Sequence, residues 1–253
     1  EPVPAGTTDV TAVDCRPGGR CLALGVISGR VGTLKPSSSG AWKAGGVVPT
    51  PASVATSLSC TDSVHCWATS AQLVDVGHVI GLIAVTSSGG ATWTLQSLPV
   101  GTGALQGIDC TPGPLSKTPA AGNTAATDTG TGATCVAVGT TATVLGGVRT
   151  GQGVILTSSD GGGTWASAKV TPTAADLLGV SCAAGPCVAV GTTAASAPQA
   201  GVMVLSSTAR DPGTSWRRAV TAPVALPLTG VACVSLASCV AAGESVSVRL
   251  AAG

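Results

Sequence analysis

The sequence contains neither tyrosine nor phenylalanine, and five tryptophans are its only large aromatic residues. Charged residues are also scarce, because 12 lysines and arginines stand against 11 aspartates and glutamates in a chain of 253 residues. A domain that binds nucleic acid presents clustered lysine and arginine to the phosphates, and an electrostatic membrane anchor needs a similar basic surface. The composition therefore argues against nucleic-acid partners and against attachment to a membrane through charge.

A membrane-spanning segment is also not expected. Residues 219–243 carry no charge and are long enough on paper to cross a bilayer. The stretch contains Pro223 and Pro227, however, and it includes Cys233 and Cys239, which fall in register with repeats described below. We therefore interpret it as part of a repeating soluble fold and predict no transmembrane segment.

The ten cysteines fall into five sequential pairs. An even number of cysteines at a repeating spacing is typical of disulfides formed in an oxidising compartment. Zinc sites favour C-x₂-C pairs with histidine, which these gaps do not provide, and the chain has only two histidines. We predict a secreted or extracytoplasmic, cell-surface protein in which the bridges replace aromatic packing. The predicted disulfides are Cys15–Cys21, Cys60–Cys66, Cys110–Cys135, Cys182–Cys187 and Cys233–Cys239.

A repeat appears when the five pairs are aligned on their first cysteine. The steps between these cysteines are 45, 50, 72 and 51 residues. In each unit a short apolar segment ends at the first cysteine and a second segment starts at the second one. A third apolar segment follows in most units, and Trp42, Trp93, Trp165 and Trp216 then open a fourth. Four short strands in about 50 residues are typical of a propeller blade.

These patterns predict an all-β fold, a five-bladed β-propeller with four-stranded antiparallel blades and one intra-blade disulfide per blade. The whole chain, 1–253, is expected to form a single domain. The last unit lacks a tryptophan and a fourth strand, so we expect residues 1–4 to close it and hide its open edge. The predicted units are roughly 5–48, 49–100, 101–172, 173–222 and 223–253.

The third unit contains an insertion between its two cysteines. Residues 111–134 are rich in threonine, alanine, glycine and proline, a composition that cannot bury a core. We expect a flexible surface loop held at its base by the Cys110–Cys135 bridge. It is either a tolerated expansion or an arm that binds a partner.

One turn carries a recognisable motif. Residues 158–165 read S-S-D-G-G-G-T-W and follow an apolar run, and residues 86–93 repeat the pattern in weaker form. The motif resembles the Asp-box (BNR) repeat of sialidase-like β-propellers. The resemblance implies structural roles, away from the functional face, for Ser158, Asp160, Gly162 and Trp165. It would also imply a tyrosine nucleophile in a sialidase, so the absence of tyrosine predicts a non-sialidase member.

Candidate site residues occupy the position just before the first cysteine of each unit. Asp14, Ser59, Asp109 and Ser181 stand there, with Ala232 in the last unit. If this position faces the central channel, the two carboxylates and two hydroxyls would line it. Three alternatives follow: a hydrated channel mouth, a weak calcium site at Asp14 and Asp109, or a hydrolytic pair. We predict no required cofactor.

Trp67 is the candidate aromatic contact for a ligand, because it follows Cys66 and has no counterpart in the other units. The predicted function is non-catalytic: a secreted or cell-surface binding or scaffold propeller that engages a protein or glycan of the cell envelope, acting as a monomer. The alternative is a carbohydrate-binding, lectin-like propeller or a glycoside hydrolase. No catalytic residues are assigned.

Overall fold

The computed structural model describes most of the chain. The described residues are 2–16, 20–50, 53–75, 78–113, 132–141, 144–145, 148–149, 152–168, 170–171, 174–183, 187–193, 201–206, 216–218, 226–235, 238–243 and 246–251. All regular elements in these ranges are β-strands. Within them, no helix has the length and hydropathy needed to span a membrane.

The strands form five main sheets, which we number in chain order. The first sheet contains β1 (Thr7–Arg16), β2 (Arg20–Ile27), β3 (Arg30–Pro36) and β4 (Trp42–Val47). The second contains β5 (Ser53–Cys60), β6 (Cys66–Asp75), β7 (His78–Thr86) and β8 (Thr94–Leu95). The third contains β9 (Leu105–Thr111), β10 (Thr134–Thr140), β13 (Gly153–Ser158) and β14 (Ala166–Ala168). The fourth contains β15 (Val170–Thr171), β16 (Ala174–Cys182), β17 (Cys187–Thr193), β18 (Gly201–Ser206) and β19 (Trp216–Arg218). The fifth contains β20 (Gly230–Ser235), β21 (Ser238–Gly243) and β22 (Val246–Ala251).

The predicted internal order of the sheets is confirmed. Consecutive strands pair antiparallel, with the first strand at one edge and the strand at or just after the tryptophan towards the other. In every sheet the two half-cystines face each other across the first hairpin, as Cys15 faces Cys21 and Cys135 faces Cys110. All five predicted disulfides are present. The bridges therefore fix the register of each first hairpin.

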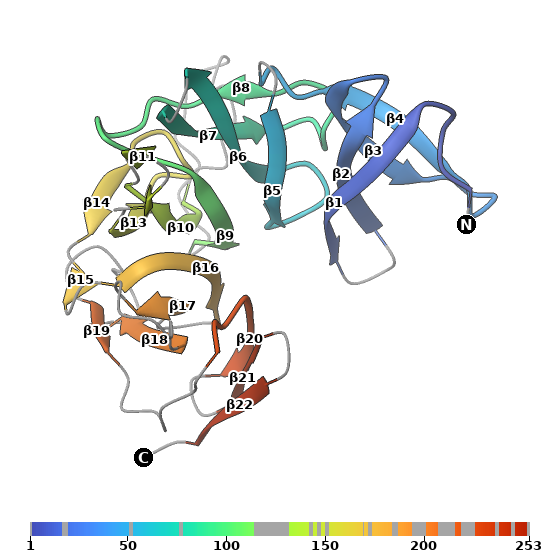
Figure 1. Ribbon diagram of the computed structural model, residues 1–253. Coiled ribbons are helices and arrows are strands. Elements are labelled where there is room, and N and C mark those ends of the chain that lie inside the picture. Colours follow the sequence, from blue (N-terminus) through green and yellow to red (C-terminus); the bar gives the residue numbers. More distant parts are fainter. Residues whose placement is uncertain are drawn as a thin grey trace, which may run out of the picture.

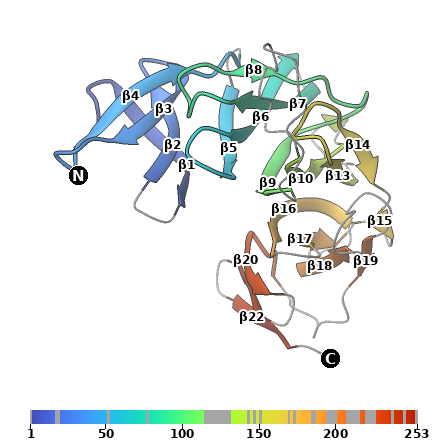
Figure 2. The same ribbon diagram turned by 180° about the vertical axis from the view of Figure 1, so that it is seen from behind.

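The five sheets follow one another around an arc, with their first strands β1, β5, β9, β16 and β20 towards its concave side (Figure 1). Figure 2 shows the same arc from behind. Neighbouring sheets pack face to face at four joints, which we number in chain order. Each joint has its own cluster of buried side chains, with Leu24 and Cys66 at the first and Val188 and Cys239 at the fourth. Because strand side chains alternate, each inner sheet contributes one face to the joint before it and the other to the joint after it.

Glycine lets the first strands approach closely. A Cβ atom built on Gly107 would lie 3.3 Å from the Cα of Gly179, and one built on Gly179 would lie 3.3 Å from the Cα of Gly230. These three glycines occupy the same position, three residues before the first cysteine of units three, four and five. A side chain at position 107 or 179 would therefore press on the adjacent sheet, whereas a Cβ atom built on Gly230 meets nothing within 4 Å.

Ring closure is not confirmed. The carbonyl oxygen of Pro2 accepts a hydrogen bond from the N–H of Trp42, 3.0 Å away, so residue 2 pairs with β4 of the first sheet. The first and fifth sheets lie at opposite ends of the arc (Figure 1). The outward faces of the end sheets remain accessible, with Val13 57% exposed, Val240 43% and Val234 85%. The closing role predicted for residues 1–4 therefore stays a prediction.

Two features of the pairing differ from the expected pattern. A small hairpin joins β11 (Val144–Leu145) to β12 (Val148–Arg149) outside the main sheets. In addition, β15 pairs parallel with β19, which gives the fourth sheet a fifth strand. The inserted loop predicted at 111–134 lies outside the described residues from 114 to 131, and its base is closed by the pairing of Thr111 with Thr134.

Candidate functional site

The residue just before the first cysteine of each unit holds the next sheet. The carboxylate Oδ2 of Asp14 accepts a hydrogen bond of 2.6 Å from the backbone N–H of Cys60. In the same way Asp109 Oδ2, in the third sheet, accepts a bond of 2.7 Å from the N–H of Cys182 in the fourth sheet. Each bond joins residues more than 40 positions apart in the sequence, and we call these contacts latches.

Serine makes the same contact at the other two joints. The Oγ of Ser59 accepts a bond of 3.0 Å from the N–H of Cys110, and Ser181 Oγ accepts one of 3.1 Å from Cys233. Ser59 Oγ also donates to Asp109 Oδ1 at 3.4 Å. All four joints are therefore latched by a side-chain oxygen at one repeated position. Ala232, at this position in the fifth sheet, has no oxygen to offer.

This geometry gives the four predicted channel residues a defined structural role. A backbone N–H that is removed from water needs an acceptor, and an ionised carboxylate makes a shorter, stronger bond than a hydroxyl does. The sequence grouped the right residues, but the periodic pattern could not show that their oxygens point to the following sheet. Their use in ligand binding stays a prediction.

Asp109 has an unusual environment for a carboxylate. Burial raises its pKa to about 6, against the lowering effects of the Cys182 N–H and of the positive charge of Arg16. The negative charge of Asp14 adds to the increase, and the Ser59 hydroxyl opposes it. A carboxyl group with this pKa changes charge under mildly acidic conditions.

Trp67 does not form an exposed aromatic contact. Its side chain is 0% exposed and lies in the second joint, where its Nε1–H donates a 2.9 Å bond to the carbonyl of Gly161. The expectation that Trp67 is exposed to a ligand is therefore wrong for this structure. The residue directly after the second cysteine of a pair faces the next sheet in the first four units, and in this unit a tryptophan fills the space that leucine or valine fills in the others.

The turn at residues 158–165 is ordered by its own side chains. Gly162 N–H donates to Ser158 Oγ at 2.8 Å, and Thr164 N–H donates to Asp160 Oδ1 at 2.9 Å. Gly161 and Gly162 have φ angles of 72° and 89°, which favour glycine. Burial raises the pKa of Asp160, but bonds from Thr164 and Ser158 outweigh it, so the pKa is lowered overall. Trp165 is buried nearby, and the structural Asp-box roles of these residues stay a prediction.

The possible calcium site at Asp14 and Asp109 remains untested. Both carboxylates accept backbone N–H groups, and Asp14 also accepts a 2.8 Å bond from Nη2 of Arg16. In the described ranges, no group of three or more histidine, cysteine, aspartate or glutamate side chains is arranged to hold a metal ion.

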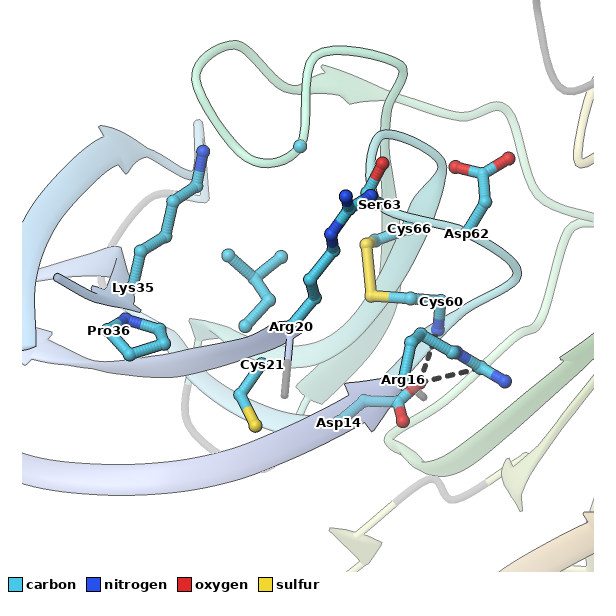
Figure 3. A pocket seen from close by; sticks show the side chains of 12 residues that line it. Asp14, Arg16, Arg20, Cys21, Lys35, Pro36, Cys60, Asp62, Ser63 and Cys66 are labelled. Carbon is cyan, nitrogen blue, oxygen red and sulfur yellow. Dashed lines mark hydrogen bonds and ion pairs between the residues drawn. A yellow bond between two sulfur atoms is a disulfide. The ribbon is translucent and has the colours of Figure 1, made fainter. Parts of the chain in front are cut away.

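The first joint contains a cavity of about 260 Å³ (Figure 3). Side chains of the first sheet form one wall, and the Cys60–Cys66 hairpin of the second sheet forms the other. Leu22 and the two disulfides supply apolar surface between charged groups. The lining residues are Asp14, Arg16, Arg20, Cys21, Leu22, Lys35, Pro36, Cys60, Asp62, Ser63, Cys66 and Gly89.

Both carboxylates of this cavity are already engaged. Asp14 pairs with Arg16 and latches Cys60. Asp62 accepts the N–H groups of Val64 and His65 at 2.7 and 2.8 Å, and its Oδ2 lies 2.7 Å from His65 Nδ1. Although burial raises the pKa of Asp62, these bonds lower it overall, so Asp62 remains ionised and tied to its own loop.

The cavity also contains two positively charged side chains, Arg20 and Lys35. In the described part of the chain, neither has a carboxylate within ion-pair distance. Figure 3 shows Arg20 extending from β2 into the space between Lys35 and the Cys60–Cys66 disulfide. The Nε of Arg16 is buried and also lacks a hydrogen-bond partner among the described residues. The cavity therefore favours a negatively charged group.

Sequence reasoning did not find this cavity. Arg20 and Lys35 are 15 residues apart, and neither occurs in a motif. One usable signal was the uneven distribution of basic residues, since the chain has only 12 of them and five lie in the first unit. Only the packing of the first sheet against the second brings them to one opening.

Comparison with known proteins identifies the fold. No family model matches the chain, and no curated protein matches it in sequence. Solved structures do match. YCF48 bound to a D1 peptide is 13% identical, with a TM-score of 0.50 over 96% of this chain and 66% of that one. Virginiamycin B lyase from Staphylococcus aureus is 10% identical, with a TM-score of 0.50 over 96% and 70%. An α-L-arabinofuranosidase from Fusarium graminearum, with an iminosugar inhibitor, is 10% identical, with a TM-score of 0.51 over 95% and 75%.

These likenesses show a propeller-type all-β fold. Three of the five main sheets are four-stranded and antiparallel, and the chain carries five disulfides, which indicate an oxidising environment. It spans about two thirds of the length of the first of these proteins, at 66%. At identities of 10–13%, activity does not follow from the likeness.

Proposed function

We propose that this chain is a non-catalytic binding or scaffold domain, a secreted Asp-box propeller of five units that acts as a monomer at the cell surface. The observation that carries this proposal is the cavity of the first joint, where Arg20 and Lys35 face an opening without a carboxylate partner among the described residues. A charged side chain without a partner is a feature of binding surfaces, where the ligand completes the pairing.

The contacts of Asp14 and Asp109 favour a binding role over one in which these two carboxylates catalyse hydrolysis. Glycoside hydrolases place two carboxyl groups on either side of a scissile bond. Asp14 and Asp109 instead each accept the N–H of a half-cystine in the following sheet, and Asp14 is also neutralised by Arg16. Among structures of this fold type, one holds a peptide, which is compatible with a peptide-binding role here.

A cavity-blocking variant tests the proposal. The purified domain is screened on a peptide array and a glycan array and assayed with a panel of nitrophenyl glycosides. Ser63→Trp places a bulky side chain at the opening, and Ser38→Trp makes the same change at an exposed position of the turn between β3 and β4, outside the cavity. We expect saturable binding without turnover, lost in S63W and retained in S38W. Turnover of a glycoside, or equal loss in both variants, would overturn the proposal.

A further inference from the structure

Three of the chain's 12 basic residues line the cavity of the first joint. Arg16 is committed to Asp14, whereas Arg20 and Lys35 stand apart from any described carboxylate. Asp62 is held by its own turn through three contacts, so it is not available to neutralise them. The uncompensated charge in the opening is therefore positive.

The size of the opening limits what it can hold. A volume of about 260 Å³ is that of roughly nine water molecules in the liquid, enough for one or two side chains or a single sugar ring. Drug-sized ligands generally occupy larger pockets, from about 300 Å³ upwards. The cavity therefore suits a small charged group presented by a larger molecule.

The chemistry of the lining distinguishes a peptide from a sugar. Sugar rings are usually bound against the flat face of an aromatic side chain, and no aromatic residue lines this cavity. The apolar surface comes instead from Leu22, Pro36 and the disulfides. Aliphatic surface of this kind packs against the methylene groups of a glutamate side chain, while the guanidinium and ammonium groups meet its carboxylate.

From this geometry we infer that Arg20 and Lys35 bind the carboxylate of an acidic peptide segment at the first joint. Arginine offers two parallel N–H donors that match the two oxygens of a carboxylate, and lysine adds a mobile point charge. Lys35 lies close to the second sheet, since its Nζ is 3.5 Å from the position that a Cβ on Gly89 would take. The two cations thus come from the first sheet but lie along the wall of the second. This inference rests on the proposed binding function and names its ligand class.

The test uses isothermal titration calorimetry with a capped pentapeptide that alternates glycine with two glutamates. Its counterpart with two glutamines has the same shape without the charges, and galacturonate and inorganic phosphate report on other anions. The variant R20Q/K35Q removes both cations. The control R30Q/K43Q makes the same change in net charge at two exposed residues of β3 and β4 that do not line this cavity.

We expect the glutamate peptide to bind the wild-type chain and R30Q/K43Q alike, and R20Q/K35Q to bind it about tenfold more weakly or not at all. Raising the ionic strength should weaken binding because exposed charges are screened. Several results would overturn the inference: no binding to the wild type, equal binding of the glutamine peptide, equal loss in both variants, or tighter binding of galacturonate or phosphate. If S63W abolishes binding of an array ligand and R20Q/K35Q does not, the inference fails while the binding function stands.

Discussion

The first and third joints are both latched by an aspartate that accepts the N–H of a half-cystine in the next sheet. At the first joint, Asp14 also pairs with Arg16 beside an open cavity. At the third joint, Asp109 is surrounded closely enough that burial raises its pKa to about 6. The same residue type at the same repeated position thus lies in two different environments. The first joint leaves room for a ligand, whereas burial at the third joint makes the charge of the latch sensitive to pH.

The largest expected effect is on how the free energy of unfolding depends on pH at the Asp109 latch. The pKa of Asp109 rises from 3.8 to about 6 on folding, so between these values the folded chain binds more protons than the unfolded chain. The contribution of Asp109 to the free energy of unfolding is therefore fully present at low pH. It is lost as the pH rises through about 6, and the free energy of unfolding falls by about 3 kcal/mol in total. Asp109→Asn removes this titration. Urea unfolding followed by tryptophan fluorescence from pH 4 to 8 should show the difference between the two proteins.

The same series contains its own control. Asp109→Asn keeps an oxygen that can accept the N–H of Cys182, so the latch survives while the charge is lost. Carboxylates remote from Asp109 titrate identically in both proteins, so the difference between the two free energies of unfolding reports on the Asp109 site. A wild-type slope equal to that of D109N would contradict the assignment.

A second prediction compares the bridges at the same two joints. The Cys60–Cys66 disulfide belongs to the first joint and Cys182–Cys187 to the third, and their sequence separations are 6 and 5 residues. Loops of this length constrain the unfolded chain by about 2 kcal/mol each. The double variants C60A/C66A and C182A/C187A should therefore lose similar free energy in chemical denaturation. An unchanged melting temperature in either would refute the idea that the bridges replace aromatic packing.

The smallest expected effect separates the two kinds of latch. Asp14→Ala leaves the N–H of Cys60 without its acceptor and should cost about 1 kcal/mol. Asp14→Ser installs the residue that makes this contact at positions 59 and 181, and should recover at least half of that loss. Thermal unfolding of the wild type and both variants at pH 7 measures this. A serine variant no more stable than the alanine variant would show that Arg16, and not the latch, accounts for the effect.

The repeat itself could be predicted from the sequence. The spacing of the cysteines was enough to place the hairpins and pair the disulfides, because each bridge joins neighbours on adjacent strands. The tryptophans marked the start of the fourth strands for a similar reason. These are local features, and strand periodicity with turn residues predicts them well.

The contacts between sheets could not be predicted in the same way. Asp14 and Asp109 look like a pair of channel carboxylates, and only the offset between sheets shows that each one reaches the next half-cystine. Trp67 looks unusual in sequence, but it lies buried in a joint because of the side of β6 on which it sits. Arg20 and Lys35 line a cavity only because the second sheet packs opposite them.

The latches give the row of sheets a polarity. Every acceptor belongs to the earlier sheet and every donor to the later one, so the two ends of the row are chemically unlike. A sheet packed against the outward face of the fifth would meet alanine at position 232, which has no side-chain oxygen to accept its N–H. A sheet packed against the outward face of the first would instead have to supply the acceptor for the N–H of Cys15. The two outward faces are therefore not interchangeable as docking surfaces for another sheet.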